Sequence, residues 1–134
     1  MSKFFTLMAV LAISVSTSFS QVCTPDSSLI GAAFPVQPLP FDSIDSPNGG
    51  IRDTACIGKP FFFAFQAAVG DTLNFGTIEL PLDSIRMATS GSIGNLPTGL
   101  SYECNPPNCV FRKNTLGCIA IIGTVIDASL VGDH

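Results

Sequence analysis

Histidine, tyrosine and tryptophan are almost missing from this chain: it has one histidine, His134, one tyrosine, Tyr102, and no tryptophan. Because the histidine is the last residue, a Ser-His-Asp or Cys-His catalytic arrangement has no well-placed base. A sugar-binding platform also lacks its usual exposed aromatic rings. We therefore expect a protein that is not an enzyme, without a cofactor.

Charge is scarce as well. Charged residues make up 12% of the sequence and the formal net charge is −4. Without a basic patch to displace counterions from phosphates, the chain is not expected to bind nucleic acid. Hydrophobic residues reach 46%, which predicts either a well-filled core or a surface that meets a protein or cell-surface partner, whose identity the sequence does not give.

The N-terminus has the pattern of an export signal. Lys3 precedes an apolar run from Phe4 to Val15, and small residues at Ser18 and Ser20 suit a cleavage site. The apolar run is shorter than the ~20 residues of a membrane span. We predict a helical signal peptide over residues 1–20, a secreted mature chain that starts at Gln21, and no membrane span in that mature chain.

Helical periodicity is missing from residues 21–134. Prolines interrupt residues 21–55, which we interpret as an N-terminal arm with short extended pieces at a sheet edge. Residues 56–134 are interpreted as the main module. There, Phe61–Ala67 alternates with both faces apolar, which predicts a strand covered on both sides and ending at Gly70. Short strands between turn residues predict an all-β antiparallel sandwich.

Further strands are expected along the module. Residues 73–80 fit a strand or a hairpin, and residues 84–90 alternate again. Residues 100–104 are expected to form one strand, and residues 118–124 a second strand that runs back beside it. We interpret the connection between them as a long loop. The turn before them is Leu96-Pro97-Thr98-Gly99-Leu100, in which Pro97 fixes φ, Gly99 can take a positive φ, and the two leucines reach the core.

This turn and the later Ile122-Gly123-Thr124 resemble the motif of Ig-like bacterial surface domains related to cadherin modules. The cysteine-bearing stretch from Tyr102 to Cys118 is similar to a variant in large secreted bacterial proteins that often carry a type IX secretion sorting domain. The resemblance implies an Ig-like β-sandwich without enzymatic activity. Its structural residues here are Leu96, Pro97, Gly99, Leu100, Gly123 and Thr124.

The sequence departs from that pattern in two places. Val125 stands where the family usually has proline, and the final strand of the module should start only at residues 132–134. We therefore expect an incomplete module that lacks its last strand, with an exposed sheet edge.

All five cysteines are disulfide candidates in an exported chain. Two bridges among five cysteines allow 5 × 3 = 15 arrangements, and spacing does not choose among them. We prefer Cys23–Cys56 plus one bridge within the last three, with one thiol left over. Three cysteines without histidine are one ligand short of a zinc site, so disulfides are favoured. The candidates are Cys23, Cys56, Cys104, Cys109 and Cys118.

Two groups of oxygen ligands are weaker candidates. Carboxylates that could form a glycosidase pair are scattered over turns and strands, so we read them as surface charges; they are Asp71, Glu79, Asp83 and Glu103. The oxygen-rich stretch from Asp42 to Asp53 lacks the Gly and Glu of an EF-hand and is read as a turn cluster. We assign no metal site.

The function that follows is a structural spacer or adhesion scaffold on a secreted or cell-surface protein, an inference from fold analogy. Two alternatives stay open. One is a small secreted disulfide-rich binder or inhibitor, and the other is an accessory domain of an exported hydrolase.

Overall fold

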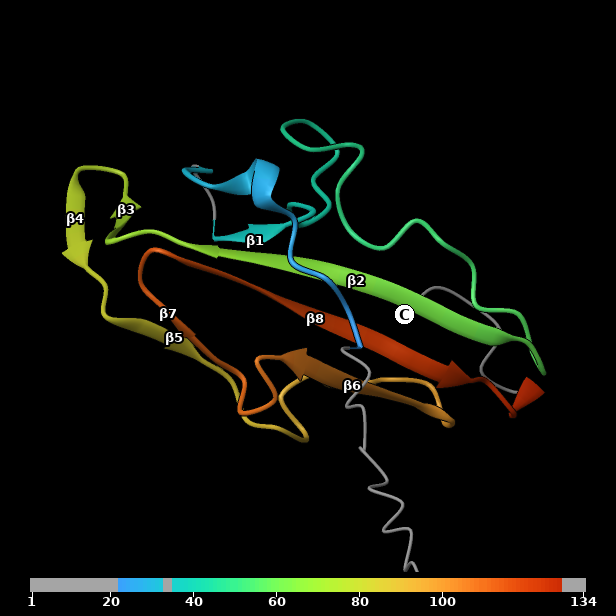
Figure 1. Ribbon diagram of the computed structural model, residues 1–134. Helices are drawn as coiled ribbons and strands as arrows, with labels where there is room; N and C mark the ends of the chain where they lie inside the picture. Colours follow the sequence, from blue (N-terminus) through green and yellow to red (C-terminus); the bar gives the residue numbers. More distant parts are fainter. Residues whose placement is uncertain (1–21, 33–34, 129–134) are drawn as a thin grey trace, which may run out of the picture.

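The computed structural model describes residues 22–32 and 35–128, and in them the protein is all-β (Figure 1). The elements named in these ranges are the 3-10 turn η1 and eight strands: η1 Ser27–Leu29, β1 Val36–Gln37, β2 Pro60–Val69, β3 Thr72–Phe75, β4 Ile78–Pro81, β5 Ser84–Arg86, β6 Leu100–Asn105, β7 Val110–Arg112 and β8 Thr115–Thr124. No helix within the described ranges has the length and hydrophobicity needed to span a membrane. The predicted signal peptide and the predicted start of a last strand lie outside these ranges.

A four-stranded antiparallel sheet, in the order β1-β2-β8-β6, forms the centre of the molecule (Figure 1). Its two ten-residue strands, β2 and β8, pair along their whole length, from Pro60 opposite Thr124 to Val69 opposite Thr115. The prediction of a strand ending at Gly70 is confirmed. Residues 73–80, for which a strand or a hairpin was expected, form a hairpin, the β3–β4 pair, and β4 ends at Pro81.

The main hydrophobic core covers one face of this sheet. In β2 and β8 the odd-numbered residues point to this face, and in β6 the even-numbered ones do, as the period of two in strands requires. The small β5–β7 sheet supplies Phe111, which is only 2% exposed. Eight buried residues make up this core: Ala67, Val69, Tyr102, Cys104, Cys109, Phe111, Ile119 and Ile121.

The described residues cover the opposite face of the sheet, called the back face below, at one end only. There the segment from Val22 to Asp26 crosses all three long strands. It is bonded to Cys118 of β8 by a disulfide, it accepts a hydrogen bond from Asn105 of β6, and it exchanges hydrogen bonds with Gln66 of β2. Cys118 and Ala120 are fully buried beneath it.

The other end of the back face is open, and this corrects one prediction. β2 was expected to be covered on both sides, yet Phe62 is 55% exposed. Its cross-strand neighbour Ile122 is only partly buried. The physical reason is the path of the arm. Its described residues are held over the cross-strand neighbours Gln66 and Cys118 and do not extend along the sheet as far as Phe62.

Two further expectations need correction. The connection between residues 105 and 117 was predicted to be a long loop, but it contains β7, which pairs with β5. The strand predicted over residues 84–90 is shorter, since β5 ends at Arg86. The extended pieces predicted in the arm are represented by β1, which pairs with β2 at the sheet edge over two residues only.

Candidate interaction surface

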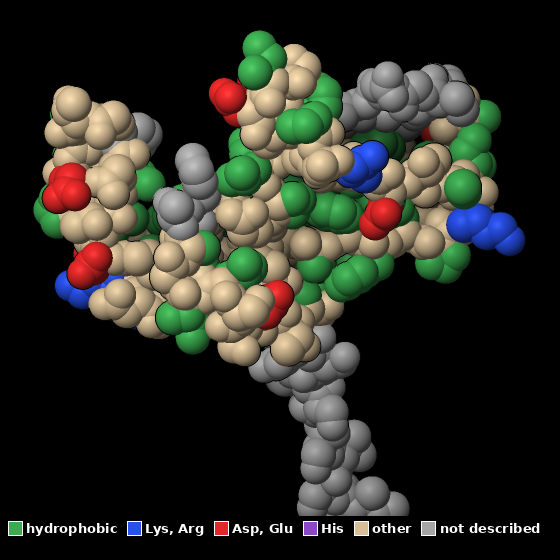
Figure 2. All heavy atoms as spheres, turned by 90° about the horizontal axis from the view of Figure 1, so that it is seen from above, with side chains coloured by type: hydrophobic (Ala, Val, Ile, Leu, Met, Phe, Trp, Pro, Cys, Tyr) green, Lys and Arg blue, Asp and Glu red, His purple; other side chains and the backbone are tan. Residues whose placement is uncertain are grey.

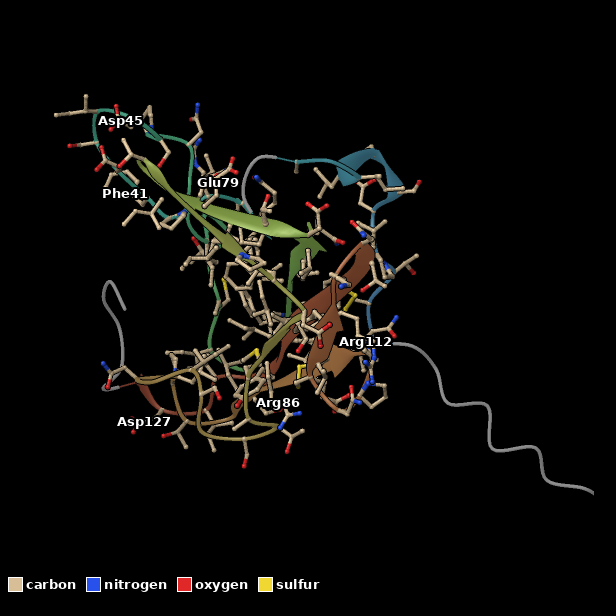
Figure 3. The ribbon with its side chains drawn as sticks, turned by 90° about the vertical axis from the view of Figure 1, so that its left-hand side faces the viewer. Phe41, Asp45, Glu79, Arg86, Arg112 and Asp127 are labelled. Carbon is tan, nitrogen blue, oxygen red and sulfur yellow. A yellow bond between two sulfur atoms is a disulfide. The ribbon has the colours of Figure 1, made fainter. Side chains whose placement is uncertain are left out.

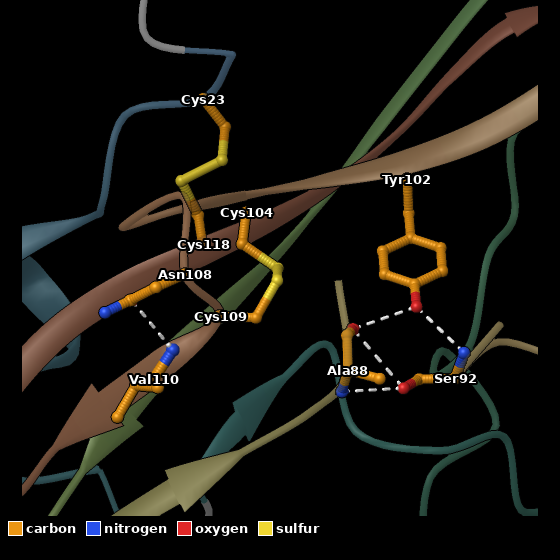
Figure 4. The surroundings of a disulfide bond; sticks show 9 residues. All are labelled: Cys23, Ala88, Ser92, Tyr102, Cys104, Asn108, Cys109, Val110 and Cys118. Atoms are coloured by element: carbon orange, nitrogen blue, oxygen red, sulfur yellow. Dashed lines mark hydrogen bonds between the residues drawn. A yellow bond between two sulfur atoms is a disulfide. The ribbon is translucent and has the colours of Figure 1, made fainter. Parts of the chain in front are cut away.

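Two disulfides hold the central sheet, and one predicted pairing is wrong. Cys23 bonds to Cys118, not to Cys56, while Cys104 bonds to Cys109 as one bridge within the last three cysteines (Figure 4). Cys56 is exposed and carries the free thiol. Cys56 precedes β2 in an exposed turn, whereas Cys23 lies above the buried centre of β8. Since the three cysteines considered for zinc are all in disulfides, none of them is a thiolate ligand.

The predicted turn motif lies where β6 and β8 meet. Gly99 has φ of 98° and Gly123 has φ of 136°, both in the region that favours glycine. A Cβ on Gly123 would collide with the carbonyl oxygen of Gly99, and one on Gly99 with that of Thr124. Thr124 donates its backbone N–H to Gly99. Leu96 and Leu100 pack against the main core. Close approach of two backbones therefore explains both glycines.

One glycine with a similar role was missed. A Cβ on Gly117 would meet the ring of Phe111, so this residue lets β7 pack closely against β8. It was expected in the connection before the strand predicted over residues 118–124, whereas β8 already begins at Thr115.

Tyr102 fastens the loop that follows β5 to the central sheet. Its hydroxyl donates to the carbonyl oxygen of Ala88 at 2.9 Å and accepts from the backbone N–H of Ser92 at 2.8 Å (Figure 4). Beside it lies a hollow of about 240 Å³, bounded by residues 89–96 and by Leu100, Ser101 and Tyr102. The buried hydroxyl in its lining, that of Tyr102, is already bonded to Ala88 and Ser92, and Thr89, Ser90 and Ser101 are exposed, so this hollow has the character of a surface groove.

Acidic groups are dispersed rather than gathered. In Figure 3, Asp45, Glu79 and Asp127 lie on separate parts of the molecule. Asp83 pairs with Lys113 at 3.8 Å, and both side chains are largely exposed. Within the described ranges, no three His, Cys, Asp or Glu side chains are grouped to hold a metal ion.

The oxygen-rich stretch of the arm uses its oxygens locally. The Asp42 carboxylate accepts from the backbone N–H groups of Asp45 and Ile44, at 2.9 and 2.8 Å, and these bonds lower the pKa of Asp42 below 3.8. Asn48 accepts from Arg52 at 2.6 Å. These are the bonds of an ordinary turn cluster.

The most conspicuous unpartnered feature is the outer edge of β2. Ala68 donates its N–H to Pro35, next to β1, so the even-numbered residues of β2 turn their backbone groups toward that side. Because β1 covers only Gln66 and Ala67, the N–H and C=O groups of Phe62 and Ala64 point outward past its end. The loop before β2 passes on this side (Figure 1), and no described residue hydrogen-bonds to them.

Exposed hydrophobic side chains surround this edge. Figure 2 looks onto the molecule from the β1 side and shows hydrophobic side chains with only a few charged ones between them. Phe62 is the most exposed hydrophobic residue of the four-stranded sheet, and Ile57 and Ile126, at 46% and 69%, flank the same end of the β2–β8 pair. We call the backbone groups of Phe62 and Ala64, with the Phe62 ring, the β2 edge site.

No family model, curated protein or solved structure matches the chain.

Proposed function

We propose that this chain is an exported, Ig-like structural module that acts as a spacer or adhesion scaffold on a secreted or cell-surface bacterial protein. The observation that carries the proposal is the pair of disulfides, of which Cys23–Cys118 ties the N-terminal arm to β8 and Cys104–Cys109 ties the end of β6 to the loop that follows it. Disulfides persist in oxidising compartments and are rare in the cytosol. A chain whose arm and β6–β7 loop are held by disulfides is suited to an oxidising environment outside the cell.

The Ig-like part of the proposal is supported by the turn motif. Gly99 and Gly123 lie where two backbones cross closely. This contact explains why both positions of the motif are glycine, independently of the resemblance. The non-enzymatic part is supported by the scattered carboxylates and by the use of the arm oxygens within their own turn. A scaffold needs a rigid sheet and an accessible surface, and the described residues provide both.

One observation favours a second candidate, a small secreted binder. The β2 edge site leaves strand hydrogen-bonding groups and an aromatic ring unpartnered, as expected of a surface that meets another protein.

Export is tested by producing the whole chain with a C-terminal tag in a Gram-negative host and following it into the periplasm or medium. The expected product begins at Gln21 and carries no free thiol except that of Cys56. A matched variant with Leu11→Arg breaks the apolar run and should stay uncleaved inside the cell. Recovery of the unmodified chain as an uncleaved, fully reduced cytosolic protein would contradict the proposal.

A further inference from the structure

We propose that residues 51–57 are a processing site, where an extracellular endopeptidase of the trypsin class cuts the chain between Arg52 and Asp53. The product is a two-chain protein whose parts stay joined by the Cys23–Cys118 disulfide. This inference goes beyond the scaffold role, and it depends on export only for the protease that the chain meets.

The segment is exposed and its backbone is unpaired. Residues 51–57 contain neither helix nor strand, and all of them except Ala55 are exposed. No described residue shares a backbone hydrogen bond with residues 51–55. The segment runs over the surface of the molecule on its way to β2 (Figure 1). Proteases cut most readily where the backbone is already accessible and no structure has to open first. This stretch therefore meets the physical requirement in the folded state.

The fold protects the other basic residues that follow the predicted signal peptide. Arg86 lies in β5 and Arg112 lies in β7, and these two strands pair with each other. Lys113 donates its backbone N–H to the carbonyl of Asp83. Lys59 is followed by a proline, whose nitrogen has no N–H and whose ring fixes the backbone. The structure therefore singles out one bond among those that a trypsin-class enzyme recognises by sequence.

The Arg52 side chain can reach a protease. Its guanidinium donates to the Asn48 side chain at 2.6 Å, and both residues are exposed. Water replaces such a surface hydrogen bond at small cost. Among the described residues, no carboxylate holds Arg52 in an ion pair. The guanidinium is therefore free to leave Asn48 and enter the specificity pocket of the enzyme, where trypsin carries a carboxylate.

The proposed reaction is a hydrolysis, with water as the co-reactant. The C–N bond between Arg52 and Asp53 breaks. The hydroxyl of water joins the carbonyl carbon of Arg52, and the remaining proton of water joins the nitrogen of Asp53. The new carboxylic acid then passes its proton to the new amine, which leaves one carboxylate and one ammonium group.

Both sides of the cut remain attached to the sheet. On the N-terminal side, the disulfide between Cys23 and Cys118 fastens the arm to β8, and β1 pairs with β2. On the C-terminal side, Gly58 donates its N–H to the carbonyl of Val125. The cut therefore frees only the two short ends next to it, and we expect the two-chain protein to keep its fold.

The first test is a brief digestion with dilute trypsin of the whole oxidised chain, recovered from an exporting host. We expect one product that has gained the mass of one water and stays a single species until it is reduced. Reduction in denaturant should separate a chain ending at Arg52 from a chain beginning at Asp53. This cut should be at least about 100-fold faster than those after Arg86 and Arg112, which need their strands to open.

Matched variants assign the cut to one side chain. Arg52→Gln should abolish the early product, and Arg52→Lys should keep it, because trypsin accepts both cations. The control is Arg86→Gln, which removes another exposed arginine and should leave the digestion pattern unchanged. Circular dichroism checks that each variant, and the two-chain product, keeps the fold of the parent.

A second test separates fold from sequence. In the reduced, denatured chain the strands no longer protect their bonds, so the preference for Arg52 over Arg86 and Arg112 should disappear. If that preference were as large in the denatured chain as in the folded one, the exposed segment would not be its cause and the proposal would be overturned.

Three other results overturn the proposal: a first cut at another bond, loss of the arm before reduction, or an exported chain that stays uncut in the medium of its native host. Failure of export combined with a first cut after Arg52 in the purified protein would refute the proposed function alone.

Discussion

Substituting Gly123 with alanine tests the tightest point of the fold. The residue has φ of 136°, which costs a non-glycine residue about 1–3 kcal/mol. A Cβ there would also collide with the carbonyl oxygen of Gly99 and lie 3.1 Å from the Cα of Leu100. Because both neighbours are backbone, the two strands must separate, at a cost of about 1–3 kcal/mol more. We expect Gly123→Ala to lower the free energy of unfolding by about 2–6 kcal/mol.

The assay is urea unfolding of the oxidised protein, followed by circular dichroism. The matched control is Gly94→Ala, because no atom lies within 4 Å of a Cβ at that exposed position. It should change the free energy of unfolding by less than about 0.5 kcal/mol, as is usual for surface substitutions. If Gly123→Ala were no less stable than this control, the close crossing of β6 and β8 would be refuted.

The other predictions concern the two disulfides, Tyr102, and the carboxylates of Asp26 and Asp42. Replacing both Cys23 and Cys118 by alanine should lower the free energy of unfolding by about 4–5 kcal/mol, because that disulfide joins residues 95 positions apart. The same change at Cys104 and Cys109, which are 5 positions apart, should lower it by about 2 kcal/mol. Equal losses of stability in urea unfolding would contradict this difference. Tyr102→Phe should cost about 1–3 kcal/mol and speed amide exchange at Ser92, since its hydroxyl fastens that loop. Unchanged exchange there would refute the anchoring role. The carboxylates of Asp26 and Asp42 have lowered pKa values because they accept backbone N–H groups. Their stabilisation is therefore present above the unfolded-state pKa, near 3.8, and is lost as pH falls through the lower folded-state values. Asp42→Asn should lower the free energy of unfolding at pH 6 but not at pH 2. A loss of stability that is the same at both pH values would contradict this.

Regular features of the sheet could be predicted because their causes are local. The alternation of Phe61, Phe63 and Phe65 indicates a strand, and the breaks at Gly70 and Pro81 set where two strands end. The turn before β6 was marked by Pro97 and Gly99. In each case the signal is a backbone preference or a period of two within a few residues.

The disulfide between Cys23 and Cys118, β7 and the open edge of β2 depend on contacts between distant parts of the chain. Cys23 and Cys118 are 95 residues apart, and they meet only because the arm folds back over β8. β7 has three residues, too few for a clear alternation, and it is specified by burial of Phe111 against the sheet. The edge of β2 is open because β1 stops after Gln37. A sequence pattern does not record how long a neighbouring strand is.

Peptide mapping of the exported, unreduced chain tests the central claim, that two disulfides fasten an all-β sheet outside the cell. Trypsin should leave the peptide ending at Arg52 joined to the one starting at Asn114, through Cys23 and Cys118. It should leave Cys104 and Cys109 bonded within the peptide from Met87 to Arg112, and Cys56 should be alkylated on an unlinked peptide. A link between the peptides of Cys23 and Cys56, or five alkylated cysteines, would contradict the account.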